Sequence, residues 1–257
     1  LIIPMAGLGN RFLREGYKRT KPLIEVSGKS MVLQAINDLP NFEQKVFVLR
    51  KDMPEFDETT KLLNATYPNS YIKIVPHITE GQASSTLEGF KALKNKTKIA
   101  PVTISACDNG VIFNLDKFNN LMQDDEIDIF VWGAKGHANA IRNPNMYGWI
   151  DHKQNGIIKK ISVKKPINND TNKPIIIGTF TFKKTSMLEK VLEKLIKEEI
   201  RVNGEYYLDS CINLAIDLGM KCKYFQVENF ICWGTPNDLK TFEYWQSCFH
   251  KWKLHDY

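Results

Sequence analysis

The first 26 residues place an apolar strand, a glycine loop, an arginine and a lysine in one order. Gly7 and Gly9 follow a predicted strand at residues 1–4, and glycine lets backbone N–H groups approach an anion without a Cβ in the way. Arg11 and Lys21 then add fixed positive charge. This combination is typical of a site that handles a triphosphate.

The glycine loop fits neither of two common phosphate motifs. No Gly-Lys-Ser/Thr follows it, as a Walker A loop would require, and Phe12 stands where a dinucleotide fingerprint has its third glycine. An ordinary turn after a strand also explains two glycines taken alone. Neither a P-loop ATPase nor a Rossmann dehydrogenase is indicated.

A second polar sequence, Ser105-Ala106-Cys107-Asp108-Asn109, ends a predicted buried strand. Open α/β sheets bind ligands at the carboxyl edge of their strands, where the Asp108 carboxylate would emerge. Mg²⁺ takes oxygen ligands and is often held by one or two carboxylates together with substrate phosphates. A helix cap or turn residue is the alternative explanation for an aspartate in this position.

The elements that must position these residues alternate between strands and helices. Apolar strands are predicted at residues 1–5, 45–49, 71–75, 99–106 and 127–131, and helices at residues 31–39, 56–66, 84–93 and 115–122. This alternation predicts a three-layer αβα fold with a mostly parallel, Rossmann-like mixed sheet. Residues 147–183 contain strands separated only by turns, which predict an added antiparallel lobe on the substrate side. Helices at 186–199 and 207–218, a strand at 221–227 and a helix from Pro236 complete the prediction.

Composition agrees with a single enzyme-like domain that spans residues 1–257. The chain is 43% hydrophobic and 25% charged, and its net charge of +6 comes from 35 basic and 29 acidic residues spread along the sequence. No run of like charge suggests a nucleic-acid-binding arm. No apolar stretch approaches the ~20 residues of a membrane span, so we expect a cytoplasmic protein whose five cysteines are reduced thiols. Leu1 already lies in an apolar run, and we expect a few residues to precede it in the native protein.

The chain resembles the sugar-nucleotidyltransferase (nucleotide-diphosphate-sugar pyrophosphorylase) family. The family signature is a glycine-rich loop that ends in Gly-x-Arg and is followed by Lys-Pro, matched here by Gly9-Asn10-Arg11-Phe12 and Lys21-Pro22-Leu23. The resemblance implies the nucleotide-diphospho-sugar transferase fold and a loop that wraps the nucleotide phosphates. It also implies that Arg11 and Lys21 neutralise the charge of departing pyrophosphate, and that Asp108 binds Mg²⁺.

The resemblance continues along nearly the whole chain. Glu80-Gly81-Gln82-Ala83 is similar to the family segment that contacts the base and ribose, although it also suits a helix N-terminus capped by Ser84 or Ser85. The implied residues are Arg11, Lys21 and Asp108 for catalysis; Ala6, Gly7, Gly9 and Gln82 for the nucleotide; and Tyr147, Gly148, Lys164, Lys165 and Glu205 for the acceptor. Relatives of this fold assemble as dimers or tetramers, so a homo-oligomer is compatible with the sequence.

Two departures from the family pattern affect the acceptor and the metal. Many members have Glu-Lys-Pro where this chain has Lys164-Lys165-Pro166, and an ammonium in place of a carboxylate favours an acceptor with extra negative charge. Thymidylyltransferase-like members carry a second metal-binding aspartate where this chain has Cys232. Glu228 is a conceivable substitute, and a surface position for Glu228 is the alternative.

The resemblance implies transfer of a nucleotidyl group from a nucleoside triphosphate to a small phosphorylated acceptor. It is strongest to a bacterial branch that serves capsule and cell-surface polysaccharide synthesis and includes cytidylyltransferases acting on phosphoglutamine-like, non-sugar phosphates. We therefore expect CTP as the nucleotide. The alternatives are a sugar 1-phosphate nucleotidyltransferase that uses UTP, dTTP or CTP, and a catalytically weak regulatory subunit that binds nucleotide.

The last predicted helix carries a cluster of aromatic side chains. Phe242, Trp245 and Phe249 recur at the spacing of one helix face, with Tyr244 beside them. A base-stacking surface is one explanation of such a cluster. We expect a face packed against the rest of the protein.

Overall fold

The computed structural model describes residues 1–94 and 100–254, and its first half contains a parallel sheet. The strands β1 (Ile2–Pro4), β4 (Val46–Arg50), β5 (Tyr71–Val75) and β6 (Val102–Ile104) lie side by side in the order β6-β1-β4-β5, all parallel. Ile99, at the start of the predicted strand 99–106, lies outside the described residues. The parallel α/β half of the prediction is confirmed.

One antiparallel strand joins this half to the rest of the sheet. β11 (Ile175–Phe182) pairs antiparallel with β6 on one edge and with β8 (Ile129–Ala134) on the other, and β12 (Cys222–Gln226) then pairs parallel with β8. The hairpin of β9 (Trp149–His152) and β10 (Ile158–Ser162) extends from the end of β11. The antiparallel addition predicted from residues 147–183 is therefore present.

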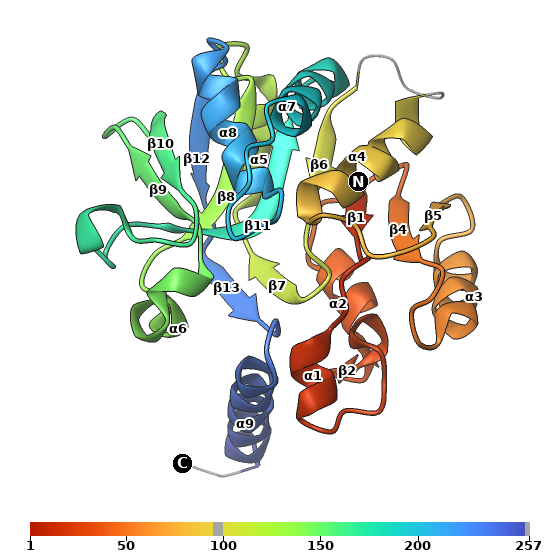
Figure 1. Ribbon diagram of the computed structural model, residues 1–257. Coiled ribbons are helices and arrows are strands. Elements are labelled where there is room, and N and C mark those ends of the chain that lie inside the picture. Colours follow the sequence, from red (N-terminus) through yellow and green to blue (C-terminus); the bar gives the residue numbers. More distant parts are fainter. Residues whose placement is uncertain (95–99, 255–257) are drawn as a thin grey trace.

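Helices cover both faces of the sheet, as strands buried on both sides require. Ile2 and Val48 face the cluster formed with α4 (Gln82–Lys94), α7 (Thr185–Lys197) and α8 (Leu208–Asp217), whereas Ile3 and Phe47 face the opposite cluster. That second face is covered by α2 (Met31–Asn37), α3 (Phe56–Thr66), α5 (Leu115–Gln123) and α6 (Ala138–Arg142). The mixed αβα architecture predicted from the sequence is confirmed (Figure 1).

Several short elements lie beyond the carboxyl edge of the parallel strands. They are α1 (Asn10–Arg14), η1 (Lys21–Leu23), β2 (Glu25–Val26), β3 (Lys29–Ser30), η2 (Pro144–Met146), η3 (Ile167–Asn169), and the pair β7 (Asn109–Ile112) and β13 (Asn229–Cys232). Phe12, Met31, Trp233 and Leu239 form a third, smaller core there. Because β13 pairs with β7 immediately after Asp108, this pairing brings residues near 233 to the edge of the sheet.

The expected packed face of the last helix is only partly present. In α9 (Pro236–Trp252), Phe242 packs edge-on against Trp233 with ring centroids 5.7 Å apart, but Trp245 and Phe249 are 54% and 58% exposed. Figure 1 shows that α9 leaves the body of the protein along its length. The packed-face prediction is therefore wrong beyond the first turns of α9. The helical period was correct, but the helix extends past the surface against which its aromatic face could pack.

No helix in the described ranges is both long enough and apolar enough to cross a membrane.

Gly89 sets how closely α4 approaches the sheet. A Cβ at this position would lie 2.8 Å from Ile2 Cγ2 and 2.8 Å from Val48 Cγ2, two stiff and fully buried methyl groups. Alanine normally gains about 1 kcal/mol over glycine in a helix, whereas overpacking a core costs about 1–3 kcal/mol. We expect Gly89→Ala to lower the free energy of unfolding by about 1–2 kcal/mol in urea titrations. A variant more stable than the wild type would contradict this packing.

Candidate active site

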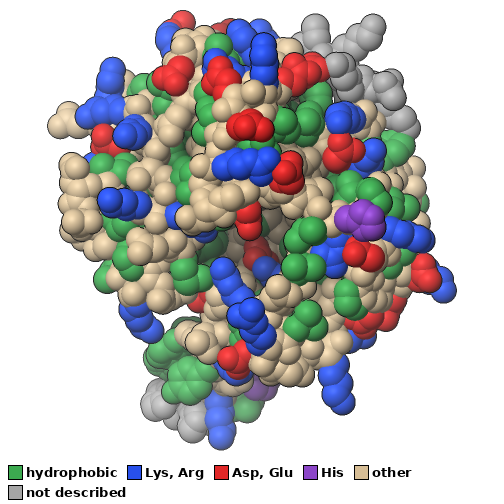
Figure 2. Space-filling view, in the orientation of Figure 1, with side chains coloured by type: hydrophobic (Ala, Val, Ile, Leu, Met, Phe, Trp, Pro, Cys, Tyr) green, Lys and Arg blue, Asp and Glu red, His purple; other side chains and the backbone are tan. Residues whose placement is uncertain are grey.

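A cavity of about 550 Å³ lies at the carboxyl edge of the parallel strands, and Figure 2 shows the corresponding hollow near the centre of one face. Its walls come from the loop after β1, the start of η1, the loop before α4, the end of β6 and the turn after β13. The sequence-predicted residues that line it are Ala6, Gly7, Gly9, Arg11, Lys21, Gln82, Asp108 and Glu205. The structure thus brings the predicted nucleotide-binding and catalytic residues together.

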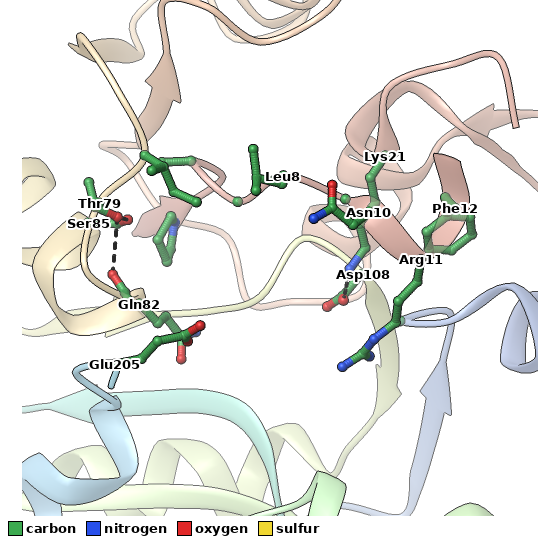
Figure 3. Close-up of a pocket in the computed structure, with 17 residues that line it drawn as sticks. Leu8, Asn10, Arg11, Phe12, Lys21, Thr79, Gln82, Ser85, Asp108 and Glu205 are labelled. Atoms are coloured by element: carbon green, nitrogen blue, oxygen red, sulfur yellow. Dashed lines mark hydrogen bonds and ion pairs between the residues drawn. The ribbon is translucent and has the colours of Figure 1, made fainter. Parts of the chain in front are cut away.

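The glycine loop is shaped by its last glycine. Gly9 has φ +66°, a left-handed conformation, and a Cβ there would lie 3.4 Å from the Lys21 side chain. Phe12, which is 1% exposed, anchors α1 in the small core. Arg11 precedes this anchor, is itself exposed, and extends from α1 into the cavity (Figure 3). Gly9 and Phe12 therefore fix the backbone position from which the Arg11 side chain extends.

Lys21 and Asp108 form an ion pair inside the cavity. Their side chains are 23% and 24% exposed, so water screens the pair only partly. Burial alone would lower the pKa of Lys21, but the facing Asp108 carboxylate outweighs burial and raises the pKa above the usual lysine value. Lys21 therefore remains cationic.

The loop that carries Gln82 is clamped to the start of α8. Tyr206 N–H donates to the Glu80 carbonyl at 2.8 Å, and Ala83 N–H donates to the Tyr206 carbonyl at 3.0 Å. Gly81 has φ +127°, and a Cβ there would lie 2.6 Å from the Tyr206 carbonyl oxygen. Only glycine fits this approach. Figure 3 shows Gln82 and Glu205 side by side at the end of the cavity away from Lys21.

The turn after β13 closes the cavity beside Asp108. Trp233 N–H donates to the Asp108 carbonyl at 2.9 Å, and a Cβ on Gly234 would lie 3.1 Å from Asp108 Oδ2. The Cys232 thiol makes two hydrogen bonds to neighbouring residues. Its Sγ donates to Asp238 Oδ2 at 3.5 Å and accepts from Gly234 N–H at 3.4 Å. Burial, and then the carboxylates of Asp238 and Asp108, raise the pKa of the Cys232 thiol. The thiol therefore stays protonated.

Asp108 suits Mg²⁺ as a single protein carboxylate. It lines the cavity where substrate phosphates would complete the coordination, as is common for Mg²⁺. Glu228 does not accompany it: Cys232 lies opposite Asn109, whereas Glu228 N–H pairs with the Ile112 carbonyl, roughly 13 Å away along β13 at 3.3 Å per residue. Glu228 lines a different hollow. No cluster of three or more His, Cys, Asp or Glu side chains suited to a metal occurs among residues 1–94 and 100–254.

Three of the five predicted acceptor residues line one of two hollows. Glu205 lines the first cavity, whereas Lys164 and Lys165 line a second hollow of about 640 Å³ together with Asn203. The turn that carries Asn203 and Glu205, closed by a bridge between Val202 and Glu205, contributes to both hollows. The two lysines and the Lys21–Asp108 pair thus line different hollows.

Lys164 lines the second hollow in a constrained conformation. Its φ is 58°, its Nζ donates to the Met146 carbonyl at 2.5 Å, and its ammonium lies 5.3 Å from the centre of the Tyr207 ring. Burial lowers the pKa of Lys164, Asp209 raises it, and the charge of Arg11 lowers it. Arg11 lines the first cavity, and its charge also reaches Lys164 at the second hollow.

Tyr147 and Gly148, the other two predicted acceptor residues, are buried and line neither hollow. The Tyr147 side chain is buried, and its hydroxyl accepts from Asn139 Nδ2, which also donates to Asp238 at 2.9 Å. Gly148 leaves room for Asp209, since a Cβ there would lie 2.1 Å from Asp209 Oδ2. Sequence analysis missed Asp209, because an acidic residue in the first turn of a helix is ordinary and gives no sign of burial.

Asp209 makes stability depend on pH. Burial raises the pKa of this carboxyl to about 6 from an ordinary value of 3.8, although Lys164 acts in the opposite direction. A carboxyl whose pKa is raised on folding contributes stability at low pH that is lost as pH rises through its folded pKa. We expect Asp209→Asn to abolish this loss. Relative to the wild type, the free energy of unfolding of the variant should therefore rise by up to about 3 kcal/mol between about pH 4 and pH 7.

The measurement is urea unfolding of both proteins at several pH values in that range. Asp217→Asn, at the exposed end of the same helix, provides the matched control and should track the wild type. A difference between Asp209→Asn and the wild type that does not vary with pH would contradict the assignment.

Solved structures with related folds cover nearly the whole chain. A nucleoside-diphosphate-sugar pyrophosphorylase from Vibrio cholerae RC9 is 18% identical over 94% of this chain and 98% of its own, with a TM-score of 0.76. An inositol-1-phosphate CTP transferase from T. maritima is 20% identical over 94% of this chain and 92% of its own, with a TM-score of 0.69.

A putative glucose-1-phosphate thymidylyltransferase from Bacillus anthracis is 13% identical over 94% of this chain and 92% of its own, with a TM-score of 0.73. No protein-family model and no curated protein matches the sequence. The similarity of the solved structures therefore concerns the fold, and the chain has the nucleotide-diphospho-sugar transferase fold.

Proposed function

We propose that this protein is a Mg²⁺-dependent nucleotidyltransferase. An oxygen of the acceptor phosphate bonds to the α-phosphorus of a nucleoside triphosphate, the bond from that phosphorus to the bridging oxygen breaks, and the electron pair leaves with pyrophosphate. The observation that carries the proposal is the Lys21–Asp108 pair in one cavity with the glycine loop and Arg11. Three named structural neighbours with such activities support it.

The side chains perform this transfer by positioning and charge neutralisation, so no covalent intermediate is required. The loop through Gly7 and Gly9 offers backbone donors to the triphosphate, and the cationic Lys21 and Arg11 stabilise charge on the leaving pyrophosphate. Asp108 would hold Mg²⁺, which would polarise the phosphate oxygens. Gln82, with one acceptor and two donors, suits the edge of a base.

We favour CTP as the nucleotide and an acidic, non-sugar phosphate as the acceptor. The sequence resembles cytidylyltransferases of phosphoglutamine-like phosphates, a branch that serves capsule synthesis, and one structural neighbour is a CTP transferase. Lys164 and Lys165 place two amines at the second hollow. We assign the exposed Lys165 to the acceptor phosphate and Lys164 to the additional anionic group, with Asp209 and Glu205 balancing part of the Lys164 charge.

A sugar 1-phosphate acceptor with UTP, dTTP or CTP is the second candidate. Glu205 favours it, because a carboxylate that faces the cavity can accept hydrogen bonds from sugar hydroxyls. A catalytically weak nucleotide-binding subunit is the third. The protonated Cys232 beside Asp108 is the observation in its favour, and the intact Lys21–Asp108 pair counts against it.

Lys21→Met tests the catalytic assignment. Removing the ammonium deprives the leaving group of a preorganised charge, and we expect kcat/KM to fall at least ~100-fold in a pyrophosphate-release assay. Lys18→Met removes an exposed lysine of the same loop and should keep activity within about twofold of the wild type. Equal activity of the two variants would overturn the role of Lys21.

Lys164→Glu tests the acceptor. Pyrophosphate release is measured with Mg²⁺ for CTP, UTP, dTTP, ATP and GTP against sugar 1-phosphates and phosphorylated amino acids, with Asp108→Ala as the inactive control.

We expect the wild type to prefer CTP with an acidic acceptor. Lys164→Glu should reduce kcat/KM for that acceptor about tenfold or more, through loss of an ion pair and added repulsion. Lys160→Glu, the same reversal on exposed β10, should leave the preference unchanged. A wild type that prefers a neutral sugar phosphate would establish the second candidate instead.

A further inference from the structure

Arg50 is a buried cation that the proposed reaction does not use. It is the last residue of β4, at the carboxyl edge of the sheet beside β1, and it is only 4% exposed. Arginine is almost never buried without partners, because desolvation of its charge must be offset. Arg50 does not line the cavity. Its partners therefore indicate what its burial achieves.

Those partners are one carboxylate and one loop carbonyl. The Arg50 Nε–H donates to Asp52 Oδ1 at 2.5 Å, and Nη1–H donates to the Ala6 carbonyl oxygen at 3.5 Å, the long end of the hydrogen-bond range. Asp52 is 56% exposed, so it anchors the guanidinium from the solvent side. Ala6 is buried and begins the glycine loop. Arg50 thus links the exposed Asp52 carboxylate to the buried backbone at the start of the glycine loop.

The contact with the Ala6 carbonyl has a consequence for the next amide. No peptide bond in the described residues is cis, and in a planar trans peptide the C=O and the following N–H point in opposite directions. A carbonyl held toward Arg50 therefore turns the Gly7 N–H away from it. Gly7 lines the cavity, and no atom lies within 4 Å of the position of an added Cβ at Gly7.

We propose that Arg50 is a positioning residue for triphosphate binding: it holds the Ala6–Gly7 peptide with its carbonyl inward, so that the Gly7 N–H faces the phosphates. This inference rests on the proposed function, because it supplies a donor to the nucleotide that the function requires. The guanidinium geometry matters as well as the charge. Lysine at this position would keep the charge but cannot serve Asp52 and Ala6 from two separate donors of a planar fork.

The test measures binding of inorganic tripolyphosphate and of CTP by calorimetry to the wild type, Arg50→Lys, Arg50→Met and Asp52→Asn. We expect both Arg50 variants to bind tripolyphosphate and CTP about tenfold more weakly, as loss of a charge-oriented donor implies. KM for the nucleotide should rise with little change in KM for the acceptor. Asp52→Asn, which frees the guanidinium, should weaken binding about threefold. Arg14→Met, which removes an exposed charge on α1, is the control and should bind like the wild type.

The outcomes separate this inference from the proposed function. If Arg50→Lys binds tripolyphosphate as tightly as the wild type, charge alone is sufficient and the positioning role is overturned. If Arg50→Met does not fold, Arg50→Lys and Asp52→Asn decide the question by the same comparison. If the wild type binds neither tripolyphosphate nor any nucleoside triphosphate, the proposed function fails and the inference fails with it.

Discussion

The contact between Lys21 and Asp108 is the interaction on which the site depends. It joins two segments that are 87 residues apart in sequence, η1 and the residue just before β7, at the carboxyl edge of the parallel sheet. Burial of an isolated ammonium would be costly, and the facing Asp108 carboxylate keeps the Lys21 ammonium charged inside the cavity. The same pairing leaves the lysine charged where a triphosphate would arrive and leaves the carboxylate where Mg²⁺ would be held.

The rest of the fold can be understood as support for this pair. The glycine loop and Phe12 hold α1, and the pairing of β7 with β13 brings Gly234 against Asp108, where a Cβ would already lie 3.1 Å from Oδ2. On the other side, backbone bonds to Tyr206 fix the loop that carries Gln82. The last two contacts join the parallel half to the part of the chain added after β8. The two halves therefore build one site at the edge between them.

The sequence predicted those features that are encoded locally. Apolar periodicity predicted the alternating strands and helices, and the order of Gly7, Gly9, Arg11 and Lys21 predicted one phosphate-facing wall, whose residues do line one cavity. Features set by distant contacts could not be predicted. The β7–β13 pair joins short segments about 120 residues apart, and the burial of Arg50 depends on a carbonyl of another strand's loop. The exposed end of α9 has the same cause, because a helical period shows which residues share a face and says nothing about what lies opposite.

The two hollows impose a constraint on where the chemistry takes place. Lys21 and Asp108 lie in one, Lys164 and Lys165 line the other, and the charge of Arg11, which lines the first, lowers the pKa of Lys164. In-line transfer requires the acceptor oxygen, the α-phosphorus and the departing oxygen to lie along one line. In the proposed transfer that line would pass from the Lys164 side toward Lys21, because this direction puts the departing charge beside a lysine held cationic by its carboxylate. Arg11, carried by a short helix that Phe12 anchors, lines the same cavity as Lys21 and would stabilise charge on the leaving pyrophosphate.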